Sequence, residues 1–444
     1  MDNLLAARMQ MAISLMFHII FAVVGIATPL MMFISEAAWL RTRNPVYLDL
    51  TKRWAKGTAI FFAVGAVSGT VLSFELGLLW PQFMEWAGPI IGMPFSLEGF
   101  AFFTEAIFLG LYLYGWNRVP PLAHLFAGLV VAVSGAASAV FVVTANAWMN
   151  TPRGFQLTAD GKPINIDPIA AMLNPAAFPQ VLHMVLAAYA AVGLAVAGIH
   201  AYVLLRHPGD RFHRAALTIA LLVGGPAALL QPIAGDIAAR TVAITQPAKL
   251  AAMEGQFETE AGAPLRIGGW PDRETRETRG AIEIPKGLSL LAFHDPNAVV
   301  KGLNDFPPEL HPPVEIVHVS FQVMVACGTV MALVVLLAGI LSLRERGVSE
   351  NRLLLRALVL ISPLGLVAIQ AGWFVTEVGR QPWIIQGVMR TRDAVTPMPG
   401  LVVPMTLITF VYILLGVVVV VLLRQQVLST TPSRVEEGGA SSNA

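Results

Sequence analysis

The chain has 444 residues, of which 56% are hydrophobic and 13% are charged, and its formal net charge is +1. Its mean hydropathy is +0.67. Soluble domains carry about 25% charged residues, so this composition excludes an ordinary soluble protein. The near-zero net charge gives no indication of nucleic-acid binding, and the single cysteine, Cys327, cannot form an internal disulfide. We therefore expect an all-α polytopic membrane protein.

Nine apolar stretches are long enough to cross a bilayer, which takes about 20 residues of α-helix. They predict about nine transmembrane helices arranged in bundles. The first run, from Met11, is too long for the h-region of a signal peptide, so we interpret it as a membrane helix. The predicted spans are residues 11–39, 57–79, 94–115, 122–145, 181–205, 215–239, 314–343, 353–376 and 401–424.

The hydrophilic breaks between these spans alternate in charge. Residues 41–56, after the first span, contain five Lys or Arg, whereas residues 81–93, after the second span, contain none. Basic residues also follow the fifth and seventh spans. Because positive loops stay in the cytoplasm, we expect the N-terminus outside and the C-terminus in the cytoplasm. Residues 425–444 are rich in Ser, Gly and Glu and predict a disordered cytoplasmic tail, which leaves residues 1–424 as the membrane domain.

The break between the sixth and seventh spans, residues 240–313, is much longer than the others and lies outside in this topology. A loop of this length is typically either functional or disordered. Its segment AKLAAMEGQFE, which contains Lys249 and Glu254, predicts a short amphipathic helix. We therefore expect at least this part of the loop to be ordered.

Four side chains that can bind iron fall at similar depth, near the outer ends of four different spans: His18, His183, Met324 and Glu377. For any single membrane histidine, an ordinary polar contact is an equal alternative. His with Met is a known axial pair for a low-spin haem, and bundles take haem ligands from facing helices. Four candidates together therefore favour a haem site.

The segment WFVTEVGRQPW, from Trp373 to Trp383, ends the eighth span. It combines the Glu377 carboxylate, the Arg380 guanidinium and two indoles within eleven residues. An interfacial anchor would explain the tryptophans and Arg380. It would not explain a glutamate at the end of an apolar helix, which is costly unless it is paired or ligates a metal.

The third span carries Glu98 and Glu105, seven residues apart and so on one helix face. Ser138 of the fourth span could join them. Two carboxyls at different depths are what a proton relay needs, and ionisable groups inside a bilayer often mark such paths. A structural pair that faces a basic partner, or part of a haem environment, is the alternative.

Several segments together carry a family resemblance. They are RMQMAISLMFHIIF, SLEGFAFFTEA, TANAWMNTP, the region of His183, AKLAAMEGQFET, VMVACG and AGWFVTEVGRQPW. In this order, the chain resembles subunit I of the cytochrome bd quinol oxidases over essentially its whole length. The segments GRQPW and AKLAAMEG are the most specific of the set.

The resemblance implies that His183 and Met324 are the axial ligands of a low-spin haem b. His18 and Glu377 match the ligands of the two remaining haems, a high-spin haem b and a haem d or a further haem b. The resemblance does not assign which of these two residues binds which haem. It also implies that Arg380 meets haem propionates and that Trp373 lies between haems.

The remaining roles that the resemblance implies concern substrate and protons. Lys249 and Glu254 match the loop residues linked to quinol binding and oxidation, which makes residues 240–313 a quinol-binding loop. Glu98, Glu105 and Ser138 match the surroundings of the oxygen-reducing site and its proton path. Glu377 also belongs to that catalytic site.

The implied activity is that of a terminal oxidase, which oxidises ubiquinol or menaquinol at the outer face and reduces O₂ to water. Protons taken from the cytoplasm would make turnover electrogenic without a pump. The implied partner is a second oxidase subunit, either subunit II or a paralogue, with or without a small accessory helix. The implied location is the bacterial cytoplasmic (inner) membrane.

The sequence departs from the family pattern in three places. The long loop lacks an insertion that some members carry, which is typical of a short-loop class. Gln322 stands where some members have Arg, and Glu98 and Glu105 are seven apart rather than eight.

Two other classes remain as alternatives. A non-catalytic paralogue would have lost part of the ligand set, all of which is present here. A proton-coupled transporter would show inverted repeats and broken helices, neither of which the sequence indicates.

Overall fold

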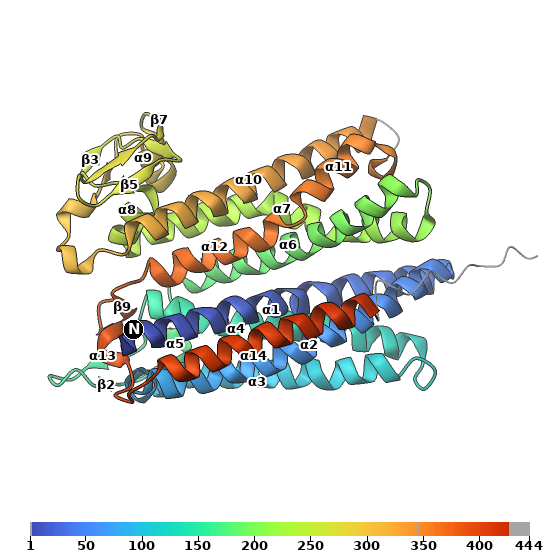
Figure 1. Ribbon diagram of the computed structural model, residues 1–444, viewed down its shortest axis with the longest axis horizontal. Coiled ribbons are helices and arrows are strands. Elements are labelled where there is room, and N and C mark those ends of the chain that lie inside the picture. The colour runs from blue at the N-terminus through green and yellow to red at the C-terminus, as the bar shows by residue number, and fades with distance from the viewer. Residues whose placement is uncertain (1, 345–346, 426–444) are drawn as a thin grey trace, which may run out of the picture.

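The structure is a computed structural model that describes residues 2–344 and 347–425 (Figure 1). Among these residues, nine helices or helix pairs are long and apolar enough to cross a membrane. They confirm the nine predicted spans. Their bounds are α1 Asn3–Thr42, α2 Pro45–Leu79, α3 Pro81–Tyr114, α4 Pro121–Asn150, α6 Ala177–Arg206, α7 Arg211–Thr245, α10 Val314–Arg344, α11 Arg352–Ile361 with α12 Leu364–Val378, and α14 Val402–Leu423.

The helices begin where the local sequence favours a helix start. Proline occupies the first turn of α2, α3 and α4, where its missing N–H costs nothing. Asn44 and Asp210 accept backbone N–H bonds at the starts of α2 and α7, as N-cap residues do. Most of these helices are longer than the predicted apolar runs because their polar ends continue past the hydrocarbon region.

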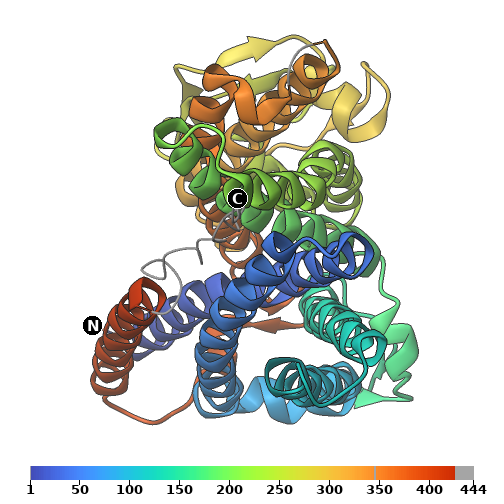
Figure 2. The ribbon, with the colours of Figure 1, turned by 90° about the vertical axis from the view of Figure 1, so that its right-hand side faces the viewer.

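The spans form two groups that lie side by side (Figure 2). Helices α1, α2, α3, α4 and α14 form one group, and α6, α7, α10, α11 and α12 form the other. The largest buried apolar cluster runs through both groups, from Ile26 of α1 and Ala139 of α4 to Leu194 of α6 and Met331 of α10. The two groups therefore share one core.

The eighth span is interrupted, which corrects the expectation that no helix is broken. Helix α11 ends at Ile361 and α12 begins at Leu364. Pro363 lacks the N–H that would continue the helix. At this break the span packs closely on α6, because a Cβ added to Gly198 would lie 2.3 Å from Ser362 Cβ. Helix α6 therefore covers the break on this side.

The long loop is more structured than the sequence predicts. After α8 (Pro247–Glu254), residues 260–300 form a compact lobe, here called the loop lobe, at one end of the bundle (Figure 1). The lobe holds three antiparallel strand pairs, β3–β8, β4–β7 and β5–β6. Its elements are β3 Glu260–Ala261, β4 Leu265–Ile267, β5 Trp270–Asp272, β6 Glu277–Arg279, β7 Ile282–Ile284, α9 Gly287–Phe293 and β8 Val299–Val300.

Helix α8 is present as predicted, but it does not have the solvent-exposed polar face expected of an amphipathic helix. All residues from Lys249 to Glu254 are buried, between the loop lobe and the membrane helices. The helix ends at Gly255, whose positive φ of 62° suits glycine. The 3₁₀ turns η1 (Leu303–Asp305) and η2 (Pro308–Leu310) then lead to α10.

The smaller elements lie at the same end of the bundle as the loop lobe (Figure 1). We call this the loop end and the opposite end the turn end. The elements are β1 Gln156–Leu157, β2 Pro163–Ile164, α5 Pro168–Met172, β9 Trp383–Ile385, β10 Met389–Arg390 and α13 Thr391–Ala394. Of the predicted disordered tail, residues 425–444, only Gln425 is described; residues 426–444 lie outside the described part of the chain.

Candidate functional site

The four candidate iron ligands lie on four helices, all in the half of the bundle nearer the loop end. His183 is near the start of α6, and Met324 is about three turns into α10. Glu377 is in the last turn of α12, and His18 is in the loop-end half of α1. The sequence predicted four candidate ligands near one end of the bundle, and the structure places all four in that half; their role as iron ligands stays a prediction.

His18 has the surroundings of a positioned imidazole. Its Nδ1 lies 3.0 Å from Ser68 Oγ, and Ser68 in turn donates to the backbone of its own helix α2. Gly69 faces the ring, because a Cβ at that position would lie 3.0 Å from His18 Cε1. A ligating histidine typically has its second nitrogen held by such a partner, so Nε2 of His18 is the nitrogen available to a metal.

His183 and Met324 each face a glycine on a neighbouring helix. A Cβ on Gly235 of α7 would lie 3.5 Å from His183 Cε1, and one on Gly372 of α12 would lie 3.0 Å from Met324 Sδ. Gln231 Nε2 donates to the His183 backbone carbonyl at 3.1 Å and lies 3.2 Å from the ring Nε2. The same amide nitrogen lies 3.3 Å from the ring Nδ1, so Gln231 packs against the His183 ring without selecting one of its nitrogens.

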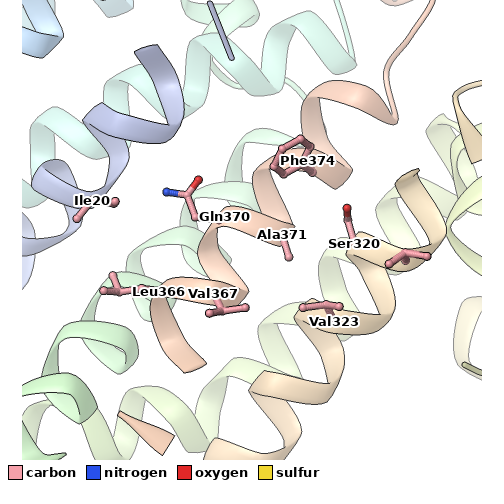
Figure 3. A pocket seen from close by; sticks show the side chains of 9 residues that line it. Ile20, Ser320, Val323, Leu366, Val367, Gln370, Ala371 and Phe374 are labelled. Carbon is pink, nitrogen blue, oxygen red and sulfur yellow. The ribbon is translucent and has the colours of Figure 1, made fainter. Parts of the chain in front are cut away.

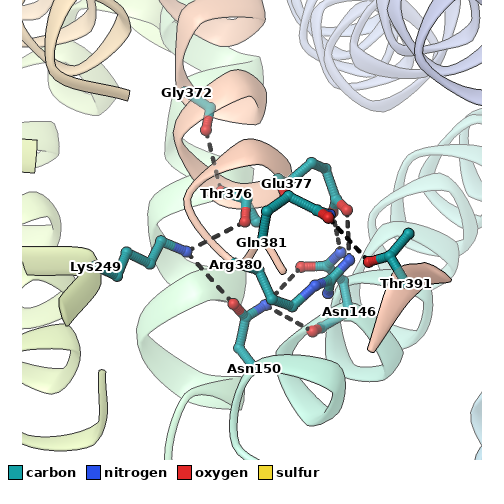
Figure 4. Close-up of polar contacts among 9 residues, drawn as sticks. All are labelled: Asn146, Asn150, Lys249, Gly372, Thr376, Glu377, Arg380, Gln381 and Thr391. Carbon is teal, nitrogen blue, oxygen red and sulfur yellow. Dashed lines mark hydrogen bonds and ion pairs between the residues drawn. The ribbon is translucent and has the colours of Figure 1, made fainter. Parts of the chain in front are cut away.

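Glu377 lies in a polar cluster between α12 and α4 (Figure 4). Arg380 Nη2 donates to Glu377 Oε2, and Asn146 Nδ2 donates to Glu377 Oε1, both at 2.5 Å. Arg380 is buried, and its Nε and Nη1 have no hydrogen-bond partner among the described residues. Buried guanidinium N–H groups are normally satisfied, so this arginine has donors available for an anionic group.

These side chains fit haem. Imidazole and thioether are established axial ligands of haem iron, and glycines rather than larger residues face His18, His183 and Met324 on the neighbouring helices. The free donors of Arg380 suit a haem propionate, since guanidinium and carboxylate pair with matched geometry. Trp373 is half-buried and packs against the shared core on the same helix as Glu377.

Lys249 of α8 joins this cluster from the loop side. Its Nζ donates to Asn150 Oδ1 at 3.4 Å and to the Thr376 carbonyl at 3.2 Å. Burial lowers the pKa of Lys249 to about 7, and the nearby Arg380 charge acts in the same direction, whereas Glu377 opposes it. This ammonium can therefore gain and lose its proton near neutral pH.

A small pocket opens beside Lys249 at the loop end, with a volume of about 110 Å³. It is formed by the start of α8, the segment before α10 and the GRQPW segment. Polar and aromatic side chains face each other across it. The lining includes Gln246, Lys249, Phe306, Arg380, Gln381 and Trp383.

Glu254 lies in a different environment from Lys249, although both belong to α8. It is 4% exposed, and burial raises its pKa to about 8, while the charge of Arg266 in the loop lobe opposes that shift. Its Oε2 is buried without a hydrogen-bond partner in the described part of the chain. The two predicted quinol residues therefore do not face one common pocket.

The predicted proton-path residues lie on α3 and α4. Ser138 Oγ donates to Glu98 Oε1 at 3.3 Å, which places the serine beside the first carboxyl as expected. Glu105 is buried and faces two glycines: a Cβ on Gly135 of α4 would lie 3.2 Å from its Oε1, and one on Gly25 of α1 would lie 4.0 Å away.

A larger groove of about 410 Å³ runs between α1, α10 and α12 (Figure 3). Its walls are almost entirely apolar, with Ile20, Val323, Val367 and Phe374 among them. None of the candidate ligands lines it. The groove is therefore distinct from the ligand positions, although it uses the helices that carry them.

Two site residues were not singled out from the sequence, namely Asn146 and Asn150. They are four residues apart on α4, and Asn150 Nδ2 donates to the Asn146 backbone carbonyl at 3.0 Å. One contacts Glu377 and the other contacts Lys249. Two amides on one face at the end of an apolar helix were the available signal.

The model of the family "Cytochrome bd terminal oxidase subunit I" matches residues 6–431. A putative cytochrome bd menaquinol oxidase subunit I from Bacillus subtilis is 38% identical, covering 95% of this chain and 96% of the relative. The cytochrome bd-II ubiquinol oxidase subunit 1 of Escherichia coli is 29% identical, covering 87% of this chain and 88% of the relative. The bd oxidase structure from Geobacillus thermodenitrificans matches with a TM-score of 0.91 and 38% identity, covering 97% of this chain and 99% of that chain.

A family match over nearly the whole described chain, with relatives of similar length, agrees with the ligand-type residues found at the loop end. The chain belongs to the cytochrome bd terminal oxidase subunit I family.

Proposed function

We propose that this chain is the haem-bearing subunit of a quinol oxidase that oxidises quinol at the loop end and reduces O₂ to water. The observation that carries the proposal is the convergence of Lys249, Glu377, Arg380 and Asn146 at one end of the bundle. This cluster joins a small pocket, lined in part by Lys249 and Arg380, to Glu377, one of the four candidate iron ligands. Family membership supports the same reaction.

We assign His183 and Met324 to a low-spin haem b, and His18 and Glu377 to a high-spin haem b and a haem d or a further haem b. When bound, these haems would supply electron transfer and oxygen reduction. The protein residues hold and orient them: Ser68 fixes the His18 ring, Gln231 packs against the His183 ring, and Arg380 offers its free N–H groups to propionates.

The quinol head group occupies the pocket beside Lys249 in this proposal. Oxidation of a quinol releases two protons with its two electrons, so the site needs groups that hold protons near neutral pH. Lys249, with a pKa of about 7, donates a hydrogen bond to a quinol oxygen when it is charged. Glu254, with a pKa of about 8, accepts a released proton from the lobe side when it is ionised.

Reduction of O₂ consumes protons, which we propose enter from the turn end. Glu105 and the Glu98–Ser138 pair hold these protons inside the membrane. The turn end is then cytoplasmic and the loop end outer, in a bacterial cytoplasmic membrane. Because electrons enter at the outer side and protons at the inner side, turnover separates charge without a pump.

The proposed assembly contains a second oxidase subunit, either subunit II or a paralogue, with or without a small accessory helix. The test is to purify that complex from membranes and to record its visible absorption spectrum in oxidised and reduced states. Quinol-driven O₂ uptake is then measured on the same sample. Haem bands with quinol-driven uptake support the proposal, haem bands without uptake indicate a non-catalytic paralogue, and the absence of haem overturns it.

A further inference from the structure

A third polar residue continues the line of Glu98 and Glu105 along α3. Tyr112 is seven residues beyond Glu105, just as Glu105 is seven beyond Glu98, so the three lie on one helix face. Tyr112 is in the last turn of α3, at the turn end, and is 0% exposed. The line of polar side chains therefore reaches the end of the bundle from which we propose protons enter.

Tyr112 belongs to a buried cluster with His124 of α4 and Glu36 of α1. His124 Nδ1 lies 2.7 Å from Glu36 Oε1, and its Nε2 lies 2.9 Å from the backbone carbonyl of Tyr112. The His124 ring packs on the Tyr112 ring with centroids 4.4 Å apart. Glu36 is 1% exposed and His124 is 2% exposed, so an acid and a base are paired here out of contact with bulk water.

The contacts of His124 determine which of its nitrogens can exchange a proton. The Tyr112 carbonyl can only accept a hydrogen bond, so Nε2 must carry a hydrogen. The second exchangeable proton lies between Nδ1 and Glu36 Oε1, on either the imidazole or the carboxyl. A short bond between two groups that can each hold the proton is the arrangement required for proton transfer.

The cluster also places a tyrosine hydroxyl against the glutamate. Glu36 Oε2 and the Tyr112 hydroxyl are both buried, and the hydroxyl lies beside the Glu36 carboxyl. Neither atom has a well-formed hydrogen bond among residues 2–344 and 347–425. Buried polar atoms are costly when unpaired and are commonly bridged by internal water, so this hydroxyl is placed to exchange a proton with Glu36.

Helix α1 connects this cluster to Glu105. Gly25, Thr28, Met32 and Glu36 follow one another at three- or four-residue spacing and so line one face of α1. Thr58 of α2 donates to Thr28 Oγ1 at 2.8 Å, Thr28 Oγ1 donates to the Val24 backbone carbonyl at 2.8 Å, and both hydroxyls are buried, so a proton passes along them only when the Thr28 hydroxyl rotates. Because Gly25 faces the Glu105 carboxyl, the two hydroxyls lie between Glu36 and Glu105 along the bundle.

The cluster is covered from the aqueous side by Trp116, which lies in the turn between α3 and α4. Its ring packs against His124 with the centroids 4.0 Å apart and the ring planes tilted by 39°, and Lys52 Nζ lies 5.3 Å from the Trp116 ring centroid. Trp116 is only partly buried, and its neighbour Asn117 is exposed. Trp116 therefore lies between His124 and the exposed turn.

We propose that the Glu36–His124 pair is the entry point for protons at the turn end. It takes a proton from water beside Trp116 and passes it, by way of the Tyr112 and Thr28–Thr58 hydroxyls and internal water, to the Glu105 carboxylate. Each transfer moves one proton and no electrons, and the pair is reset by the next proton from water. This inference rests on the proposed oxidase function and names the residues that supply its protons.

The test uses the complete oxidase complex in proteoliposomes, with the Glu36→Gln variant. Glutamine keeps the shape of glutamate and cannot carry the proton. We expect haem spectra and the KM for quinol to match those of the unaltered protein, while O₂ turnover and the rate of membrane-potential generation both fall about tenfold or more. Glu36→Asp, which restores a carboxyl, should recover part of both rates.

The matched control is His200→Gln. His200 is also a buried histidine at the turn end, with its Nδ1 2.8 Å from His213 Nδ1, but it belongs to α6, in the other helix group. Turnover and potential should be unchanged in this variant. Equal slowing in His200→Gln and Glu36→Gln would indicate general damage at this end of the bundle and overturn the assignment.

If Glu36→Gln loses haem, Tyr112→Phe is tested in its place. This substitution removes only the hydroxyl and leaves the backbone carbonyl that contacts His124. We expect it to slow potential generation severalfold. Wild-type turnover and potential in haem-loaded Glu36→Gln or Tyr112→Phe overturn the proposal. Failure of the unaltered complex to generate a potential during O₂ uptake would instead contradict inward proton transfer in the proposed function.

Discussion

Lys249 donates a hydrogen bond to the Thr376 backbone carbonyl at 3.2 Å. This bond ties α8, a helix of the long loop, to the last turn of α12, one residue before Glu377. The protonation of Lys249 is also sensitive to Glu377 and Arg380. A change in the charge of Lys249 at the proposed quinol pocket therefore changes the electrostatic potential at Glu377, a proposed iron ligand.

The low pKa of Lys249 predicts a pH-dependent quinol affinity. Because that pKa lies near 7 rather than near its usual value, the side chain is charged at pH 6 and mostly neutral at pH 8. We expect the KM for quinol to rise as pH increases through about 7, because the charged donor binds the quinol oxygen more strongly. Steady-state kinetics across this range provide the measurement.

Two variants separate the charge of Lys249 from other effects. Lys249→Arg stays charged at every accessible pH, so its KM should not vary between pH 6 and 8. Lys249→Met should raise the KM at pH 6 by about tenfold or more, the loss expected for one charged hydrogen bond. Lys286→Met, in the exposed part of the loop lobe, is the control. An unchanged pH profile in Lys249→Arg would show that another group titrates.

Glu254→Ala should slow quinol oxidation by about 100-fold, because the variant removes a carboxyl that accepts a proton on the lobe side. Haems reduced chemically should still react with O₂ at the normal rate, as followed by stopped-flow absorption. Glu274→Ala, an exposed glutamate of the same lobe, should behave as the unaltered protein. Normal quinol turnover in Glu254→Ala would remove this residue from the site.

Met324→Leu should leave the protein folded, since leucine has a similar volume, but should lose or shift the reduced low-spin haem spectrum. Redox titration of the absorption bands measures both outcomes. Met331→Leu, seven residues further along α10 and 4% exposed, is the matched control and should leave the spectrum intact. If Met324→Leu retains both spectrum and potential, Met324 is not an iron ligand.

Glu105→Gln should retain haem content and quinol binding while O₂ reduction and potential generation fall by about 100-fold. The amide fits the space beside Gly135 but cannot release a proton. The control is Glu85→Gln, an exposed glutamate near the start of the same helix. Loss of haem in Glu105→Gln would indicate a structural role, and wild-type turnover with full haem content would exclude an essential relay.

Hydropathy was sufficient to predict the nine spans, because every apolar run of membrane length became a helix. It could not predict the break near Pro363, since proline is tolerated inside other spans here, such as at Pro29 of α1. At the break before Pro363, Ser362 packs against Gly198 of α6, a contact between residues far apart in the sequence. The loop lobe was missed because its strands are only two or three residues long.

The site was predicted by residue type more completely than by geometry. Side chains that can bind iron could be recognised in the sequence because polar and ionisable residues inside an apolar helix are energetically costly and therefore usually functional. The sequence could not predict that Lys249 and Glu254 of α8 lie in different environments. Their partners are set only when the loop folds around the helix. Asn146 and Asn150 were missed because an amide near a helix end is common, and its importance depends on Glu377 and Lys249.

The close approach of α6 and α12 also bears on the distance that electrons would cross between the proposed redox centres. A Cβ on Gly365 would lie 2.4 Å from Ala191 Cα, so the two backbones are nearly in contact and no larger residue fits. These helices carry His183 and Glu377, proposed ligands of different redox centres. Electron tunnelling rates fall exponentially with separation, so we expect Gly365→Ala, which must push the two helices apart, to slow electron transfer between the proposed centres without altering any proposed ligand.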